Sequence, residues 1–277
     1  MRQKIRIAHS PDSDDAFMFY GLAEGKMDPE GFEFEHILSD IQTLNQKAME
    51  GIYEVTAISI HAYPYVCDKY ILLNSGASMG EGYGPMIVAR DTMTHRDFLK
   101  RTIAVPGELT TAFLALKIFA PEVKTQVVPF DEIMPGVKEG QYEAGLIIHE
   151  GQLTYGQEGL KLFVDLGQWW QEKTGLPLPL GGNVIRRDLG GVTHRRLDNL
   201  LKRSVQYSLE HKKEGVAYSM KYAGGMSEVL TDKFVGMYVN HWTVDYGDRG
   251  REAVARILHE GNRCGLIPRR VQPEFVS

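Results

Sequence analysis

Strand-like and helix-like segments alternate along this chain, and extended segments interrupt the alternation twice. Residues 5–9, 32–38 and 55–60 have strand-like patterns, with helix-like segments between them. A second run of alternating strands and helices spans residues 92–176, and extended segments near 86–90 and 177–185 flank it. Strands that alternate with helices are typical of βαβ units and a parallel sheet. The order therefore predicts two α/β units joined by two chain crossings.

Two crossings indicate a two-lobed, hinged protein that binds its ligand between the lobes. After the second crossing the chain continues mainly as helices, which need the sheet of the first unit to pack against. We expect a large lobe of residues 1–90 plus 183–277, a small lobe of residues 91–182 and a ligand cleft between them. This organisation resembles type II periplasmic-binding-protein folds, in which each lobe is a mostly parallel sheet flanked by helices. One continuous doubly wound sheet is the alternative.

Composition and charge exclude several classes of function. The formal net charge is −5 and the pI is about 6.0, whereas binding to phosphates needs a basic face, so we expect no nucleic acid partner. The two cysteines, Cys67 and Cys264, form no disulfide framework or zinc pattern and are compatible with a reducing compartment. We find no apolar stretch of about 18 residues and no apolar signal-peptide region near the start. We therefore expect a cytoplasmic protein without a membrane-spanning segment.

The apolar run over residues 144–148 leads directly into His149. An uninterrupted apolar run that ends near a glycine, here Gly151, predicts a buried strand of a parallel sheet. His149 would then lie at the carboxyl end of that strand, the edge where open α/β sheets bind ligands. A neutral imidazole at that edge is suited to accept a proton. The alternative is a core histidine held by a backbone partner.

Two turns between a strand and a helix carry groups that suit anions. In the first, Ser10 and the turn amides are candidates to hold an oxyanion, and Asp15 is a candidate to orient a hydroxyl; the alternative is simple capping of the helix by Asp14 or Asp15. In the second, Thr110 or Thr111 would cap a helix whose first N–H groups form an anion site. A purely structural threonine cap is the alternative there.

Other motifs are weaker. Ser59 or His61 could face the cleft from the end of a third strand, although a plain core strand is the simpler interpretation. The segment 76–80 matches G-x-S-x-G, but a nucleophile elbow requires a helix next, and residues 81–85 will not start one. We expect these glycines to let a loop approach the ligand or the other lobe. Nucleotide-binding loops and metal-binding histidine spacings are absent from the sequence, and the pair 169–170 of tryptophans predicts packing.

Several of these segments together resemble one enzyme family along nearly the whole chain. They are Ser10-Pro11, Asp14-Asp15-Ala16-Phe17, Pro106-Gly107, Thr110-Thr111-Ala112, the run from Glu143 to Glu150 and the run from Asp165 to Gly181. The chain is similar at these places to 1,4-dihydroxy-6-naphthoate synthase, which cleaves cyclic dehypoxanthinyl futalosine in the futalosine route to menaquinone. The last two runs are long and specific.

The resemblance implies a two-lobed carbon–carbon lyase that uses no metal and no organic cofactor. It implies that His149 is the catalytic base. It implies substrate contacts at Ala57, Ile58, Ser59, Thr111 and Ala112. Two positions depart from the family pattern, because Ala57 stands where a lysine is usual and Asp14 stands where an asparagine is usual.

We therefore expect a lyase whose His149 removes a proton from a small carboxylate substrate, after which ring opening and elimination form an aromatic naphthoate. Closure of the lobes would exclude water and fix the base against its proton. One alternative is chorismate dehydratase of the same pathway, which has the same fold. The other is a non-catalytic protein that binds a small anion for a transporter.

Overall fold

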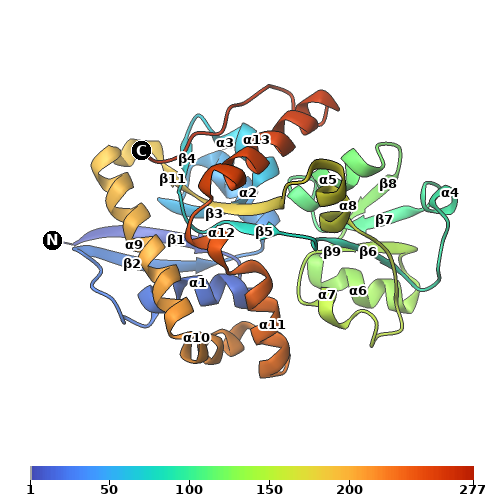
Figure 1. Ribbon diagram of the computed structural model, residues 1–277, viewed down its shortest axis with the longest axis horizontal. Coiled ribbons are helices and arrows are strands. Elements are labelled where there is room, and N and C mark those ends of the chain that lie inside the picture. The colour runs from blue at the N-terminus through green and yellow to red at the C-terminus, as the bar shows by residue number, and fades with distance from the viewer. Residues whose placement is uncertain (1) are drawn as a thin grey trace.

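The computed structural model describes residues 2–277, and it contains two β-sheets, each flanked by helices (Figure 1). The first sheet contains β1 (Gln3–His9), β2 (Phe32–Leu38), β3 (Val55–Ser59), β4 (Tyr70–Leu72), β5 (Ser78–Gly80) and β11 (Leu178–Arg186). The second contains β6 (Met86–Ala89), β7 (Thr102–Val105), β8 (Lys124–Val127), β9 (Ala144–Ile147) and β10 (Lys161–Asp165). The two-lobed α/β prediction is confirmed, and the single continuous sheet is wrong.

The chain passes between the two halves of the molecule twice, along β5 to β6 and along the approach to β11 (Figure 1). The strand order is β2-β1-β3-β11-β4 in the first sheet, with β5 paired to β11, and β10-β6-β9-β7-β8 in the second. The lobe boundaries at 90 and 183 stay a prediction; β6, within residues 1–90, pairs in the second sheet, and β11 begins at Leu178 in the first.

Both sheets are mixed, which refines the expectation of mostly parallel sheets. The strands linked by helices, β1 with β2 and β3 and β7 with β8 and β9, pair in parallel. The strands at the crossings pair antiparallel, β11 with β3, β4 and β5 and β6 with β9 and β10. A strand that enters a sheet from the other lobe has no crossover helix to set its direction, so it need not run parallel to its neighbours.

Helices cover both sheets. Around the first sheet lie α1 (Ser13–Ala23), α2 (Ile41–Glu50), α3 (Tyr63–Val66), α9 (Gly191–Glu210), α10 (Lys212–Ser219), α11 (Glu228–Tyr238), α12 (His241–Val244), α13 (Gly247–Arg263) and the 3-10 turns Ile60–Ala62, Arg187–Leu189 and Met220–Tyr222. Around the second lie α4 (His95–Phe98), α5 (Thr111–Phe119), α6 (Phe130–Glu139), α7 (Gly151–Thr154) and α8 (Leu166–Thr174). The short helices α4, α7 and α12 were not expected, because four residues carry too little periodicity to detect.

Local signals explain the helix that borders the cleft in the first half, α2. The Asp40 side chain accepts a hydrogen bond of 3.0 Å from the Thr43 N–H and so caps its start. Gly51 ends it with φ of 75°, a left-handed conformation that glycine adopts without strain. Leu44 and Ala48 point inward from it and are fully buried.

One apolar cluster joins the two halves. It includes Ile58 of β3, Leu114 of α5, Trp170 of α8 and Val184 of β11, each with no exposed surface. Removing this apolar surface from water stabilises the contact between the lobes. The expectation that the tryptophan pair packs is confirmed, since Trp170 is buried in this cluster and the ring of Trp169 lies 5.2 Å from the ring of Phe119.

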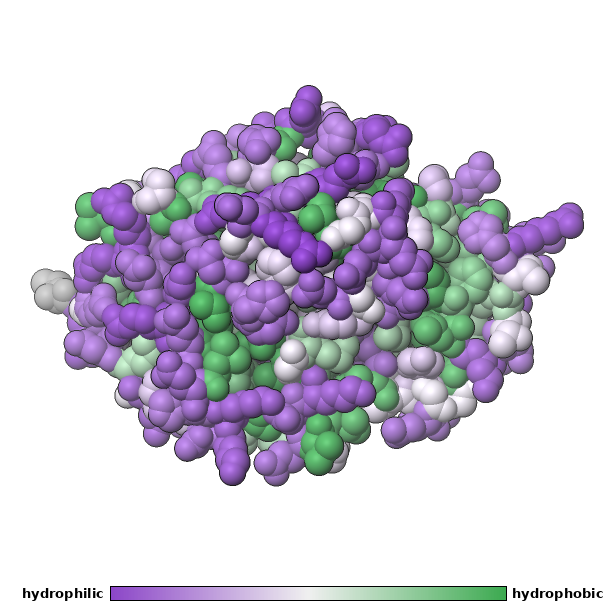
Figure 2. Space-filling model, in the orientation of Figure 1, coloured by the Kyte–Doolittle hydropathy of each residue, from purple (hydrophilic) through white to green (hydrophobic). Residues whose placement is uncertain are grey.

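Hydrophilic residues cover most of the molecular face in Figure 2, and hydrophobic residues appear there only in smaller patches over both halves. Within residues 2–277, none of the helices is both long enough and apolar enough to cross a bilayer.

Candidate functional site between the lobes

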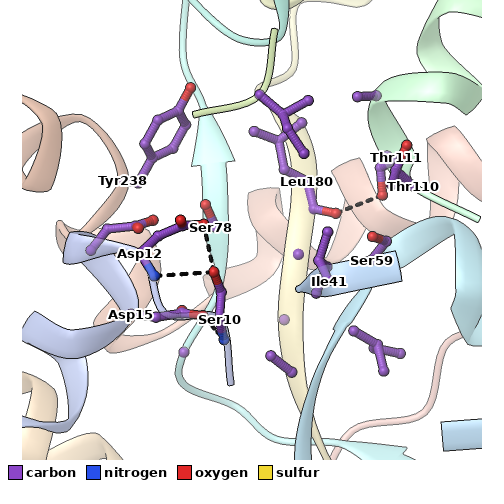
Figure 3. Close-up of a pocket in the computed structure, with 18 of the residues that line it drawn as sticks. Ser10, Asp12, Asp15, Ile41, Ser59, Ser78, Thr110, Thr111, Leu180 and Tyr238 are labelled. Atoms are coloured by element: carbon purple, nitrogen blue, oxygen red, sulfur yellow. Dashed lines mark hydrogen bonds between the residues drawn. The ribbon is translucent and has the colours of Figure 1, made fainter. Parts of the chain in front are cut away.

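A cavity that is partly open to solvent lies between the two halves of the molecule. Its walls come from the carboxyl ends of β1, β3 and β9, the strand β5, the crossing strand β11, the starts of α1, α2 and α5, and the helix α11. The lining residues are Ser10, Asp12, Asp14, Asp15, Met18, Ile41, Ala57, Ile58, Ser59, Gly76, Ser78, Pro85, Thr110, Thr111, Ala112, Ile148, Leu180, Gly181, Gly182, Asn183, Phe234 and Tyr238. Figure 3 shows two groups of polar side chains facing this space from opposite sides.

The first group, here called the hydroxyl wall, is formed by Ser59, Thr110, Thr111 and Ala112. Thr110 caps α5, because its Oγ1 accepts a hydrogen bond of 3.1 Å from the Phe113 N–H. The N–H groups at the start of a helix have no partner within the helix, and the helix dipole favours negative charge there. The hydroxyl wall therefore offers neutral donors to an anion.

Residues from both halves position the hydroxyl wall. Thr111 Oγ1 donates a hydrogen bond of 2.5 Å to the Leu180 carbonyl and accepts one of 3.1 Å from the His61 N–H. Asn45 accepts the Ser59 N–H at 2.8 Å and donates to Ser59 Oγ at 3.1 Å. Because these partners are backbone groups or a buried amide, the donors of this wall are held in place before a ligand arrives.

The second group, here called the acid wall, is formed by Ser10, Asp12, Asp14 and Asp15 at the turn between β1 and α1. Asp15 Oδ2 accepts a hydrogen bond of 2.8 Å from the Ser10 N–H, and Ser10 Oγ donates one of 2.5 Å to Asp12 Oδ2 (Figure 3). Capping by Asp14 or Asp15 is wrong, since the N-cap residue is Asp12 and its side chain makes no capping hydrogen bond. These carboxyl groups instead face the cavity.

Burial raises the pKa values of the acid wall. Burial, and then the charge of Asp12, raise the pKa of Asp15 to about 7, although the Ser10 N–H acts in the opposite direction. Burial and the carboxylates of Asp15 and Asp12 raise the pKa of Asp14 well above its usual value. Three neighbouring carboxyl groups in a partly dry space cannot all ionise at moderate cost, so protons stay on this wall near neutral pH.

No lysine or arginine is among the described residues that line the cavity. Ala57, at the position where the family pattern usually has lysine, contributes a small apolar surface instead. An anionic group that enters this cavity is therefore bound by hydroxyl and amide donors rather than by a cation, and it is repelled by any ionised member of the acid wall. The two walls make the cavity electrostatically asymmetric.

His149 lies just after β9, two residues beyond Ile147. Its neighbour Ile148 lines the cavity, while the His149 ring is mostly buried beside it, with 11% of its side chain exposed. The Gly151 N–H donates a hydrogen bond of 3.0 Å to His149 Nδ1, and the buried Nε2 has no partner among the described residues. Burial lowers the pKa of His149 to about 4, even though Asp131 acts to raise it, so the ring is neutral at pH 7.

The hydrogen bond from Gly151 determines the tautomer of that ring. A neutral imidazole has one N–H and one lone pair, and here the lone pair on Nδ1 accepts the Gly151 N–H, so the proton lies on Nε2. In this arrangement His149 presents a donor rather than an acceptor. The ring accepts a proton only after the bond to Gly151 is released.

Hydrogen bonds link the two halves on both sides of the cavity. On the α2 side, Gln42 Oε1 accepts the Leu109 N–H at 3.1 Å. On the α11 side, Tyr238 Oη donates to Gln152 Oε1 at 2.6 Å. The structure is therefore a closed form, in which polar contacts across the cleft limit the access of water.

All of the binding residues predicted from the sequence line the cavity. They are Ser10, Asp15, Ala57, Ile58, Ser59, Thr110, Thr111 and Ala112. The predicted base His149 is adjacent to the cavity rather than among its lining residues, and the roles of all nine remain predictions. Asn183 and Tyr238 also line it and were not anticipated, because nothing in the local pattern of β11 or α11 indicates that they point into a cleft.

The segment 76–80 does not form a nucleophile elbow. Ser78 begins the strand β5, paired with β11, and is not at a turn from a strand into a helix. Gly76 and Ser78 do line the cavity, as the expectation of a loop near the ligand suggested. His61, the alternative to Ser59, supports the Thr111 hydroxyl from outside the lining set. Among residues 2–277 no three His, Cys, Asp or Glu side chains are grouped as metal ligands would be.

The fold and the cavity define a two-lobed protein of the periplasmic-binding-protein type. The alkanesulfonate-binding protein SsuA from Xanthomonas axonopodis superimposes on it with a TM-score of 0.73 at 10% identity, over 97% of this chain and 96% of that one, a likeness that concerns the fold. The profile of the menaquinone biosynthesis family matches residues 5–262, and the chain belongs to that family.

Curated relatives are more specific. The chain is 41% identical to the 1,4-dihydroxy-6-naphthoate synthase of Thermus thermophilus, over 99% of this chain and 100% of the relative. It is 36% identical to the enzyme of that name from Streptomyces coelicolor, over 95% of each. A crystal structure of an Archaeoglobus fulgidus protein matches with a TM-score of 0.92 at 44% identity, over 95% of this chain and 98% of that one. The resemblance expected from the sequence is confirmed.

Proposed function

We propose that this protein is a 1,4-dihydroxy-6-naphthoate synthase, a carbon–carbon lyase that converts cyclic dehypoxanthinyl futalosine in the futalosine route to menaquinone. The carrying observation is a cavity between the two lobes with a neutral donor wall and a proton-rich acid wall, in a chain 41% identical over 99% of its length to an enzyme of that name.

The substrate carboxylate would bind at the hydroxyl wall. The first N–H groups of α5 and the hydroxyl of Ser59 supply donors there, while the Thr111 hydroxyl, whose proton is engaged by the Leu180 carbonyl, helps to fix the start of the helix. The acid wall cannot fill this role, because its oxygens repel an anion when they are ionised. The hydroxyl-bearing, sugar-derived part of the substrate would then lie toward Ser10 and Asp15.

His149 would act as the base that removes a proton from the bound substrate. Two observations support this role: the ring is neutral at pH 7, and its neighbour Ile148 touches the cavity. The role requires a change in the turn that follows β9, because Nδ1 is engaged by the Gly151 N–H. Release of that bond by the bound substrate would free the lone pair, and the closed lobes would hold base and substrate together.

The cytoplasm is the proposed location. Both Cys67 and Cys264 are unpaired thiols, as is common where the medium is reducing. A small carboxylate would be the partner at the site, and the net charge of −5 does not favour binding to nucleic acid.

Incubation of the purified protein with cyclic dehypoxanthinyl futalosine, and separately with chorismate, tests the function when the products are followed by mass. We expect 1,4-dihydroxy-6-naphthoate from the first substrate and no turnover of the second. Turnover of chorismate alone would make the protein a dehydratase of the same pathway. Tight binding of either compound without turnover would make it a binding protein.

A further inference from the structure

The acid wall contains a carboxyl group that is placed to do more than bind. Asp15 lies in the first turn of α1 and lines the cavity. Its Oδ2 is held by the Ser10 N–H at 2.8 Å, which fixes the direction of the carboxyl group. A carboxyl group that is held in a fixed direction at the wall of a cavity is an arrangement suited to proton transfer.

The surroundings of Asp15 favour its protonated form. On its own segment the charged neighbours are Asp12 and Asp14, and both are acids. The groups coupled to these two from other elements are also acidic: Asp40 before α2 acts on Asp12, and Asp14 acts on the Tyr238 hydroxyl of α11. With no lysine or arginine among the described lining residues, nothing there stabilises a full set of negative charges.

The acid wall also faces the turn that carries His149. Ile148, which precedes His149, lines the same cavity as Asp12 and Asp15. Burial, and then the charge of Asp12, raise the pKa of Glu150, which follows His149. The Glu150 side chain in turn reaches the other half, since an added side chain at Gly224 would come within 2.8 Å of its Oε1. A substrate that fills the cavity therefore contacts both the acid wall and Ile148, the residue before His149.

We propose that Asp15 is a second catalytic residue, the acid that protonates the leaving oxygen in the ring-opening elimination. This inference rests on the proposed function. His149 takes the proton from carbon, and the electron pair of that C–H bond forms a carbon–carbon double bond. The bond from the neighbouring carbon to the ring oxygen breaks, its electron pair stays on the oxygen, and Asp15 gives that oxygen its proton. Asp15 and His149 then exchange protons with water, so no oxidant or reductant is consumed.

Replacement of Asp15 by Asn separates proton donation from hydrogen bonding. The amide Oδ1 of Asn retains an acceptor for the Ser10 N–H, so we expect the variant to fold, which thermal unfolding would check. We expect kcat on cyclic dehypoxanthinyl futalosine to fall about 10²–10⁴-fold. We expect KM to change less than about threefold, because a hydrogen-bonding group remains. Asp15→Glu, which keeps an acid, should recover part of kcat.

The pH profile supplies a readout that a structural role would not move. We expect kcat of the unaltered protein to decline above about pH 7, where Asp15 loses its proton, and we expect this decline to be absent in Asp15→Asn. Asp97→Asn, the same change at an exposed position of α4, is the control and should leave the pH dependence of kcat unchanged.

Some outcomes overturn the inference. A raised KM with unchanged kcat in Asp15→Asn would mean that Asp15 only binds a hydroxyl, and unchanged kinetics would mean that it has no role in the reaction. In both cases the unaltered protein still turns over the substrate, so the proposed function stands. If the unaltered protein does not turn over cyclic dehypoxanthinyl futalosine, the proposed function fails, and the inference fails with it.

Discussion

The hydroxyl of Tyr238 donates a hydrogen bond of 2.6 Å to Oε1 of Gln152, and this bond crosses the cleft from α11 to α7. Gln152 is itself held by its Nε2, which donates to the carbonyls of Gly84 at 3.0 Å and Ile147 at 3.2 Å. Both side chains are buried. The closed form therefore includes a polar contact that opening of the lobes would expose to water.

Tyr238→Phe should weaken this contact. The change leaves the Gln152 oxygen buried without a donor, which costs about 1–2 kcal/mol of unfolding free energy. Chemical denaturation measures the loss, and a raised KM would show that closure is weakened as well. Tyr155→Phe is the matched control, because the Tyr155 hydroxyl makes no hydrogen bond within the part of the chain that the structure describes. Equal stability of the two variants would contradict a role for the cross-cleft bond.

His149→Asn should fold normally and lose most of its turnover. The Asn side chain can still accept the Gly151 N–H in this turn, while no proton acceptor of suitable strength remains. We expect kcat to fall about 10²–10⁴-fold with a small change in KM. Steady-state kinetics with cyclic dehypoxanthinyl futalosine give both constants. Turnover close to that of the unaltered protein would remove His149 from the mechanism.

Thr111→Val should weaken substrate binding. The variant loses the hydrogen bond to Leu180 and the acceptor for the His61 N–H, both of which fix the start of α5. We expect KM to rise about tenfold, which corresponds to roughly 1.4 kcal/mol of binding energy. Thr111→Ser retains the hydroxyl and should restore most of the affinity. If Ser and Val behave alike, the hydroxyl has no part in binding.

Asp15→Asn should change how stability depends on pH. The folded-state pKa of Asp15, about 7, lies above the usual value of 3.8, so the folded protein binds the extra proton between these values and its stability falls as the pH rises through them. Asn removes this decline. We expect the variant to be more stable by about 1–2 kcal/mol at pH 8, less than the full shift would give because water reaches the cavity, and equally stable near pH 4. Urea titrations at both pH values measure the difference; a constant difference would contradict the assignment.

Gly167→Ala should disturb the crossing segment. A Cβ atom at Gly167 would lie 1.9 Å from the Tyr83 carbonyl oxygen, a backbone atom that cannot rotate away. The β5–β6 connection would have to move, at a cost of about 1–3 kcal/mol. Thermal unfolding tests this, with Gly156→Ala as the control, since a Cβ there meets nothing within 4 Å. An unchanged melting temperature in Gly167→Ala would mean that the segment moves without cost.

Much of the fold could be predicted because its signals are local. Apolar runs such as 144–147 mark buried strands, and Thr110 marks the start of α5 through the chemistry of helix capping. The antiparallel pairing of β6 with β9 and of β11 with β3 could not be predicted in this way, because a strand's direction within a sheet depends on where the chain enters that sheet. The short helix α7 behind the Gly151 turn was missed for lack of periodicity.

The residues of the candidate site likewise differ in how far the sequence could predict them. Ser10 follows β1 and Thr111 begins α5 at a sheet edge, so position made both candidates for the cleft, whereas the contact at Ser59, the last residue of β3, was implied by the family resemblance. Tyr238 is far away in the sequence, on a helix that reaches the cavity only because α11 packs near α1. No local pattern predicts such a neighbour.

By itself, the sequence determined the two α/β units, the two crossings, the capped helix at the hydroxyl wall and the family, because each depends on residues near one another in the chain or on long shared motifs. Only the tertiary structure decided the chemistry of the site. The retained proton on Asp15 arises from burial and from the adjacent Asp12, and the tautomer of His149 arises from the Gly151 N–H. Both are properties of a three-dimensional surrounding, since the energy of a charge or a proton depends on which groups lie around it and how much water they exclude.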